Sequence, residues 1–292
     1  MLAAIAVAYA IRVAGVLGNA RLIASAPISG ILGILIILAY VLVAIFADVI
    51  APFGEREVIE GAQPFEPWGD VYWLGTDGLG RDMASRLIYA TRNTVGIAFL
   101  TTALAFVAGA VPGLIAAVTG GWIDNLFSRT VDVLMAIPPL IFALLFLTIL
   151  DKSLINLVIV IAIIEATRVY RLARAVAGGV VVMDYIEAAR LRGEGLPRLI
   201  GVEILPNCLA PLLAEFGLRF CFVILLISAL SFLGLGIQPP TADWGAMVRD
   251  TATLITFGDV TPLLPAAAIA LLTVAVNFVV DWALSRTSGL KD

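Results

Sequence analysis

Long apolar stretches alternate with short polar connections along this chain, and the alternation predicts its architecture. About 20 apolar residues in a helix, each rising about 1.5 Å, cross a hydrocarbon layer of roughly 30 Å. Six windows of this kind can be found, of which the fourth is short. They cover residues 28–47, 94–120, 131–150, 154–167, 212–236 and 263–283. The pattern predicts an all-α integral membrane protein with about six transmembrane helices.

Prolines interrupt two of these windows. Pro112 lies inside the second window, and Pro138 and Pro139 lie inside the third. A proline lacks the N–H that an inner helical turn requires, and neighbouring helices can satisfy the groups that it frees. We therefore expect kinks at both places.

Composition agrees with a membrane location and excludes several kinds of chemistry. Hydrophobic residues make up 61% of the chain and charged residues 14%, against about 25% charged in a soluble domain. The net charge of -4 gives no support for nucleic-acid binding. The chain has no histidine, the commonest metal ligand and general base, and its two cysteines, Cys208 and Cys221, lie in or beside apolar sequence. We expect neither a metal site nor a catalytic residue.

The distribution of lysine and arginine predicts the orientation, because cytoplasmic loops carry an excess of these residues. With the N-terminus inside, the cytoplasmic segments hold eleven of them and the external segments hold six. The resulting scheme has an interfacial or cytoplasmic segment at 1–27 and a transmembrane domain over 28–292. Its external loops are 51–92 and 237–262, and its main cytoplasmic loop is 175–208.

That cytoplasmic loop contains the most informative stretch of the chain. Glu187 to Leu191 are strong helix formers, whereas Gly193, Gly195 and Pro197 break a helix, and a new helix can begin at Pro206. The sequence predicts a helix, a turn and a second helix. A conspicuous polar loop between apolar spans indicates a docking surface.

Three motifs together resemble a known family. Glu-Ala-Ala at 187–189, the glycine at 193 and Ile-Leu-Pro at 204–206 resemble the EAA loop of ATP-binding-cassette importer permeases. The sequences LGTDGLGRD from Leu74 and LSFLGLG from Leu230, the latter followed by Gln-Pro-Pro and Trp-Gly, resemble motifs of peptide-importer permeases. The chain resembles the C-type permease subunit of dipeptide and oligopeptide importers, a group that also includes nickel and glutathione systems.

The resemblance implies that the loop places a short coupling helix in a groove of an ATPase. This role falls on Glu187, Ala188, Ala189 and Gly193, with Pro206 closing the motif. The small alanines would allow close approach, Glu187 would cap a helix or pair with a basic residue, and Gly193 would permit a tight reversal.

The resemblance also implies the partners of the chain. No G-x-x-x-x-G-K-[ST] sequence occurs, so ATP and magnesium would be bound by separate ATPase subunits and this chain would bind no cofactor. The expected assembly contains two ATPases, a related B-type permease and an extracytoplasmic substrate-binding protein, in the plasma (inner) membrane of a bacterium. The chain would form half of a translocation path for peptides.

Two groups of charged residues have simpler structural interpretations. Asp77, Arg81 and Asp82 are expected to form a salt-bridge cluster at the external membrane edge rather than a substrate site. Glu215 and Arg219 lie four residues apart on one helical face, where they can neutralise each other. Charges at membrane depth are costly, so this pair should face the helix bundle or a water-filled path.

Two other classes of protein remain open from the sequence. A secondary transporter would couple to an ion through intramembrane carboxylates such as Glu165, Glu215 and Asp281, often within an inverted repeat, and no repeat is visible. A membrane enzyme would need a convergent catalytic set built without histidine. Copurification with an ATPase would separate these classes from an importer permease.

Engineered cysteines test the predicted topology. With Cys208 and Cys221 replaced by alanine, a cysteine at Gly193 should react with an impermeant thiol reagent only from the cytoplasmic side. A cysteine at Glu60 should react only from the outside, because the span order places the two loops on opposite sides. Labelling of right-side-out and inverted vesicles measures this. Reaction of both positions from one side would contradict the six-span scheme.

Overall fold

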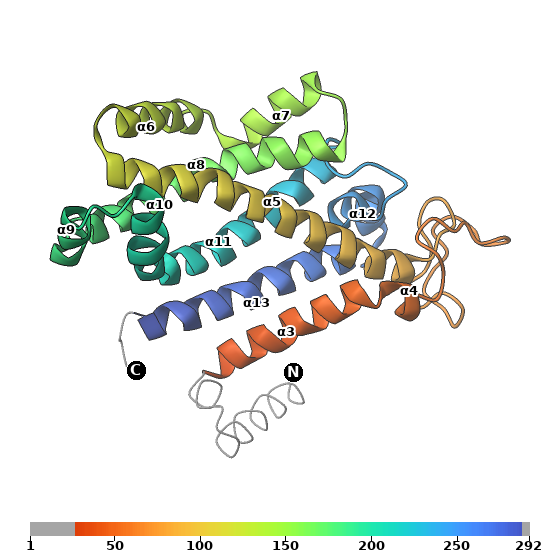
Figure 1. The fold of residues 1–292 in the computed structure, drawn as a ribbon. Helices are drawn as coiled ribbons and strands as arrows, with labels where there is room; N and C mark the ends of the chain where they lie inside the picture. The colour runs from red at the N-terminus through yellow and green to blue at the C-terminus, as the bar shows by residue number, and fades with distance from the viewer. Residues whose placement is uncertain (1–26, 288–292) are drawn as a thin grey trace, which may run out of the picture. The chain divides into compact units, whose positions relative to one another are not determined.

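The computed structural model describes residues 27–287, and within them the fold is helical (Figure 1). The predicted N-terminal interfacial segment lies outside the described residues. The elements are α3 (Ile28–Ile45), α4 (Ala47–Ile50), α5 (Met83–Thr119), α6 (Gly121–Met135), α7 (Pro139–Ile149), α8 (Leu154–Val181), α9 (Asp184–Leu191), α10 (Leu196–Arg198), the π-helix η1 (Leu199–Ile204), α11 (Leu205–Phe232), α12 (Trp244–Thr251), the 3-10 helix η2 (Ala252–Phe257) and α13 (Leu263–Thr287). In this part of the chain, extended pairing is limited to a single bridge between Thr76 and Asp82. The predicted all-α membrane fold is confirmed.

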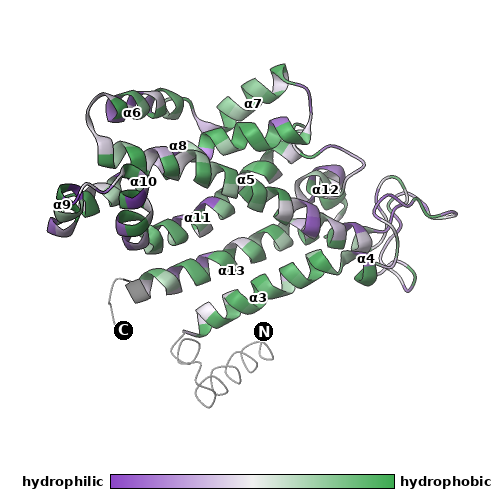
Figure 2. Ribbon diagram, viewed as in Figure 1, coloured by the Kyte–Doolittle hydropathy of each residue, from purple (hydrophilic) through white to green (hydrophobic). Residues whose placement is uncertain are grey.

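Four helical stretches among the described residues are long and apolar enough to cross a membrane. They are α3, α5, the run from Leu196 to Phe232, and α13, and the bent pair of α6 and α7 makes five if it forms one span. Figure 2 shows apolar residues along nearly all of α3, whereas α9 mixes hydrophilic and hydrophobic residues. α8 is 28 residues long but carries Glu165, Arg168, Arg171 and Arg174. The count of six spans therefore stays a prediction.

The two proline sites behave differently. α6 ends at Met135 and α7 begins at Pro139, and the two helices meet at 85° (Figure 1). The break expected at Pro138 and Pro139 is confirmed, because Pro139 fits the first turn of α7, where no N–H is required. Pro112, in contrast, lies within α5, which continues to Thr119.

The chain divides into two compact units, and α5 and α11 each contribute residues to both of them. Among the described residues, unit 1 comprises 27–98 and 224–287, and unit 2 comprises 99–223. In unit 1, α3 packs along α13. The Tyr40 hydroxyl donates to the Ala268 carbonyl at 2.8 Å, and a Cβ on Gly33 would lie 2.5 Å from the Ala275 carbonyl oxygen. The small residue therefore allows the two helices to approach closely.

Unit 2 is organised by a close contact between α5 and α8. A Cβ added to Gly113 would lie 2.8 Å from the Tyr170 carbonyl oxygen, and one added to Gly109 would collide with the Ala166 carbonyl oxygen. These glycines are four residues apart, so they lie on one face of α5 as in other small-residue helix contacts in membranes. The two helix backbones meet with no side chain between them.

A matched pair of glycine substitutions tests this contact. Gly109→Ala should lower the stability of the protein by about 1 to 3 kcal/mol, because the new methyl group must displace the backbone of α8. Gly96→Ala, in the same helix but with no atom within 4 Å of the added Cβ, should be neutral or slightly stabilising. Thermal unfolding of the detergent-solubilised protein measures both. Equal effects would show that the helices are not in backbone contact.

Candidate functional site

The helix predicted from Glu187 to Leu191 is present as α9, residues Asp184–Leu191. Acidic residues Asp184 and Glu187 stand in its first turn and Arg190 in its last, which suits the helix dipole at both ends. Gly193 adopts φ +79°, its N–H donates to the Arg190 carbonyl at 2.9 Å, and the Glu194 N–H donates to the Ala189 carbonyl at 3.2 Å. This pair of bonds is a Schellman motif, which a left-handed glycine favours. The tight reversal expected at Gly193 is confirmed.

The chain returns to helix soon after this turn. Pro197 lies in the first turn of α10, where its missing N–H is not required, and η1 and α11 follow without a gap. α11 begins at Leu205, beside Pro206, as the sequence predicts, but the helical path starts nine residues earlier, at Leu196. The wider turn of the π-helix at Leu199–Ile204 directly precedes Pro206.

One face of α9 is buried in unit 2. Ile186 and Ala189 are both 0% exposed. They join a hydrophobic cluster drawn from several helices: Leu114, Ala173, Ala177, Leu199, Ile204, Cys208 and Leu212. Ala189 was expected at a docking surface together with Ala188, and this expectation is corrected. Its small side chain packs inside the chain, because residues three apart at 186 and 189 share the core-facing side of the helix.

The opposite face of α9 is open. Glu187, Ala188 and Gly193 are exposed, as is Pro206 at the start of α11. Leu191, next to the turn, is 84% exposed. Sequence reasoning did not single out Leu191, which is the apolar residue exposed beside Glu187 and Ala188.

The charged residues of α8 and α11 meet in unit 2. Glu165 is 1% exposed and accepts from Arg168 Nη1 at 2.9 Å and from Arg219 Nη1 at 3.1 Å. Arg219 Nε also lies 2.7 Å from Glu215 Oε1. The expected pairing of Glu215 with Arg219 is confirmed. Glu165 is the partner that sequence reasoning missed, because it stands 54 residues away.

This set of four side chains, the buried ion network, carries two positive and two negative charges. Arg219 also covers the ring of Phe222, with 4.7 Å between its guanidinium carbon and the ring centroid. A single charge at the membrane centre costs about 2.5 to 3.5 kcal/mol on insertion scales. Mutual neutralisation removes much of this cost, whereas loss of one member leaves an unpaired buried charge.

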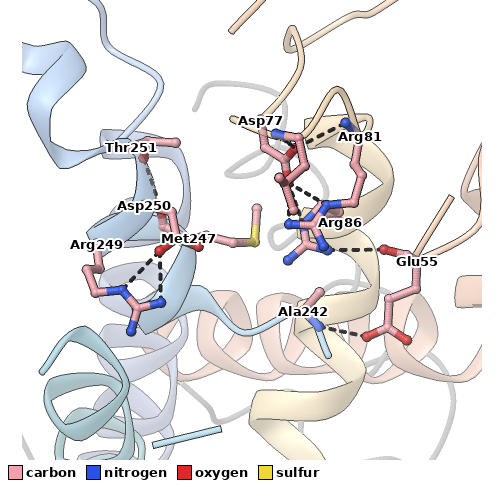
Figure 3. Close-up of polar contacts among 10 residues, drawn as sticks. Glu55, Asp77, Arg81, Arg86, Ala242, Met247, Arg249, Asp250 and Thr251 are labelled. Atoms are coloured by element: carbon pink, nitrogen blue, oxygen red, sulfur yellow. Dashed lines mark hydrogen bonds and ion pairs between the residues drawn. The ribbon is translucent and has the colours of Figure 1, made fainter. Parts of the chain in front are cut away.

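A second polar cluster lies in unit 1 and is shown in Figure 3. Asp77 accepts from Arg81 Nε at 2.8 Å and lies 3.3 Å from Arg86 Nε, and it also accepts from the N–H groups of Leu79 and Arg81. These contacts fold the turn that leads into α5. Asp77 and Arg81 thus form the structural ion pair expected from the sequence.

Asp82 was expected in the same salt-bridge cluster but has another role. Its carboxylate accepts from the N–H and the hydroxyl of Ser85, at 2.7 and 2.6 Å. Since α5 begins at Met83, Asp82 caps the N-terminus of this helix. The prediction of an ion pair was wrong for this residue, because orphan backbone donors at a helix start bind a carboxylate readily.

The motif from Leu230 to Gly245 is also structural. Asp243 caps α12 by accepting from the Ala246 N–H at 3.0 Å, and Thr94 donates to it at 2.9 Å. Burial raises the pKa of Asp243, and these hydrogen bonds oppose that shift. Trp244 is fully buried, and a Cβ on Gly245 would meet the backbone of Ser228. Glu55, missed from the sequence, accepts from the Asn93 side chain at 2.8 Å. It also accepts from the Ala242 N–H at 2.7 Å (Figure 3).

Comparison with known families decides the class of the protein. Residues 109–286, more than half of the chain, match the family described as "Binding-protein-dependent transport system inner membrane component". The chain belongs to this family. It is therefore a multi-pass permease subunit of an ATP-binding-cassette importer of the bacterial inner membrane.

Curated relatives match nearly the whole permease. It is 34% identical over 267 residues to the dipeptide transport system permease protein DppC of Haemophilus influenzae, covering 90% of this chain and 88% of that protein. It is 36% identical to the di/tripeptide transport system permease protein DppC of Pseudomonas aeruginosa, with 89% and 85% covered. It is 30% identical to the glutathione transport system permease protein GsiD of Pectobacterium atrosepticum, with 88% and 83% covered.

A solved structure supports the fold. A chain in the "Crystal structure of an amino acid ABC transporter with histidines" aligns with a TM-score of 0.51 at 18% identity, covering 68% of this permease and 92% of that chain.

Among the residues described for this permease, no group of three or more His, Cys, Asp or Glu side chains is placed to hold a metal ion.

Arg219 contacts both Glu165 and Glu215, which predicts the order in which substitutions in this network destabilise the protein. Arg219→Leu should lower stability by about 3 to 5 kcal/mol, because it leaves Glu215 unpaired and Glu165 with one arginine. Glu215→Leu should cost less, since Arg219 keeps its contact with Glu165. Arg171→Leu is the control: its ion pair with Asp132 is 58% exposed on both sides and should contribute little. Thermal unfolding of the solubilised complex gives the order. Equal losses for Arg219→Leu and Arg171→Leu would contradict the network.

Proposed function

We propose that this permease carries di- or oligopeptides into the cell and forms half of the translocation path. Its relatives support this cargo. They are named as dipeptide or di/tripeptide permeases and are 34% to 36% identical over about nine-tenths of the chain. A second candidate, glutathione, is supported by the relative at 30% identity. Glutathione is itself a small peptide, so the two candidates share charged termini and amide groups.

We propose further that the exposed face of α9 contacts a separate ATPase subunit. Its buried face is anchored in the cluster around Ile186 and Ala189, so a force applied to α9 reaches the core of unit 2. Its open face offers the carboxylate of Glu187, the small Ala188 and the apolar Leu191. A carboxylate beside an exposed leucine fits a partner groove that is apolar and has a basic rim.

The remaining partners follow from this proposal. Two ATPase subunits would bind ATP and magnesium, a related B-type permease would supply the other half of the path, and an extracytoplasmic binding protein would deliver the peptide. Closure of the ATPases around nucleotide would then rock the permease helices between inward-open and outward-open states. The ion-coupled transporter considered from the sequence is displaced by the family match.

Reconstitution tests both parts of the proposal. Proteoliposomes with the full complex should take up a labelled dipeptide only with ATP and the binding protein. Glu187→Arg should lower uptake about tenfold or more without loss of expression, because a reversed charge on α9 disfavours the ATPase contact. Asp70→Arg, the same change on an exposed residue of unit 1, should not.

A glycine pair gives a matched control within the same loop. Gly193→Ala should lower uptake, because Gly193 has φ +79°, which alanine adopts only with strain. Gly195→Ala should leave uptake unchanged, because Gly195 has φ -71°. Normal uptake in Glu187→Arg would remove α9 from the mechanism. If the wild-type complex takes up glutathione but no dipeptide, glutathione replaces dipeptides as the proposed cargo.

A further inference from the structure

One guanidinium joins the two helices that lead into and out of α9. α8 ends at Val181, α9 begins at Asp184 after two intervening residues, and the chain then passes through α10 and η1 into α11. Arg219 of α11 donates from Nη1 to Oε2 of Glu165 on α8, at 3.1 Å. The two helices are therefore joined twice, covalently through α9 and electrostatically through this pair.

Each member of the pair is oriented from its own helix. Arg168, one turn after Glu165, donates to the other carboxylate oxygen at 2.9 Å. Glu215, one turn before Arg219, lies 2.7 Å from its Nε. The side chains of Glu165 and Arg219 are 2% and 11% exposed, so water competes little for the contact. Neither side chain can turn away without losing a second charged partner.

The pair lies far from α9 along both helices. Glu165 stands 16 residues before the end of α8 at Val181, and Arg219 stands 14 residues after the start of α11 at Leu205. At about 1.5 Å per residue these separations are roughly 20 to 25 Å. The ends nearer α9 are held by the hydrophobic cluster that contains Ala173 and Ala177 of α8 with Cys208 and Leu212 of α11. The two helices are thus fixed to each other at two levels, near α9 and about half-way along each helix.

We propose that Glu165 and Arg219 are positioning residues for transport, which make α8 and α11 move as one lever when an ATPase displaces α9. This rests on the proposed coupling role of α9. Helices that touch only near α9 could slide or splay further along, whereas helices that are also tied about half-way along transmit the displacement at least to that level. A buried ion pair suits this purpose, because its directional contacts fix the register of two helices more strictly than apolar packing does.

The test is the number of peptides taken up per ATP hydrolysed by the reconstituted full complex. Arg219→Leu should lower this ratio about threefold or more while ATP hydrolysis continues, in the range found for residues that couple distant sites. Glu165→Gln keeps the shape of the side chain and should lower the ratio in the same way, so it carries the test if Arg219→Leu does not assemble. Arg171→Gln, in the exposed pair with Asp132, should leave the ratio unchanged. An unchanged ratio in both network variants would overturn the proposal.

A cross-link separates positioning from stability. With Cys208 and Cys221 replaced by alanine, the double variant Glu165→Cys and Arg219→Cys should give a low ratio that a short bifunctional thiol reagent restores, because it rejoins the middle of the two helices. Recovery of thermal stability without recovery of the ratio would overturn the lever.

The same assay keeps the two proposals apart. If Glu187→Arg uncouples transport but the network variants do not, the function of α9 stands and the lever is wrong. If neither uncouples it, α9 is not the contact and both proposals fail.

Discussion

The backbone contact between α5 and α8 is the constraint on which the rest of unit 2 depends. At Gly109 and Gly113 no side chain separates the two helices, so the position of α8 follows from that of α5. α8 in turn carries Glu165 and the small residues that support α9. A motif with no polar chemistry of its own therefore determines where the charged groups of this permease can meet.

The two units use charge in different ways. In unit 1, Asp77 and Asp82 bind backbone N–H groups as well as side chains, and they fold the turn that starts α5. In unit 2, Glu165 accepts from the side chains of two arginines, one on its own helix α8 and one on α11. The first arrangement completes a helix end. The second joins α8 and α11, the helices that precede and follow α9, where the ATPase is proposed to bind.

Sequence reasoning succeeded where a single physical pattern dominates. α3 was predicted within two residues because its apolar run is uninterrupted, and Gly193 was read correctly because few residues tolerate positive φ. α5 was predicted to begin at residue 94 but begins at Met83. Its first turns are polar and are held by the cap at Asp82, so hydropathy alone does not reveal them.

Contacts between distant residues escaped prediction for a different reason. Glu165 looked like an isolated carboxylate, because its partner Arg219 is brought near only by the packing of α8 and α11. Asp82 looked like part of a charge cluster, because a count of charges does not show which backbone donors are free. The orientation in the membrane and the partners of α9 depend on molecules outside this chain, so its sequence and fold leave them as predictions.

The two adjacent alanines of the EAA motif face opposite environments, and their tolerance to change should differ accordingly. Ala189 is enclosed by this chain, so any larger residue there conflicts with the interior of the permease whatever its partner. Ala188 is exposed, so its size is limited only by what docks against it. In evolution, position 189 should follow the packing of the permease, whereas position 188 should vary together with the surface of the proposed ATPase partner.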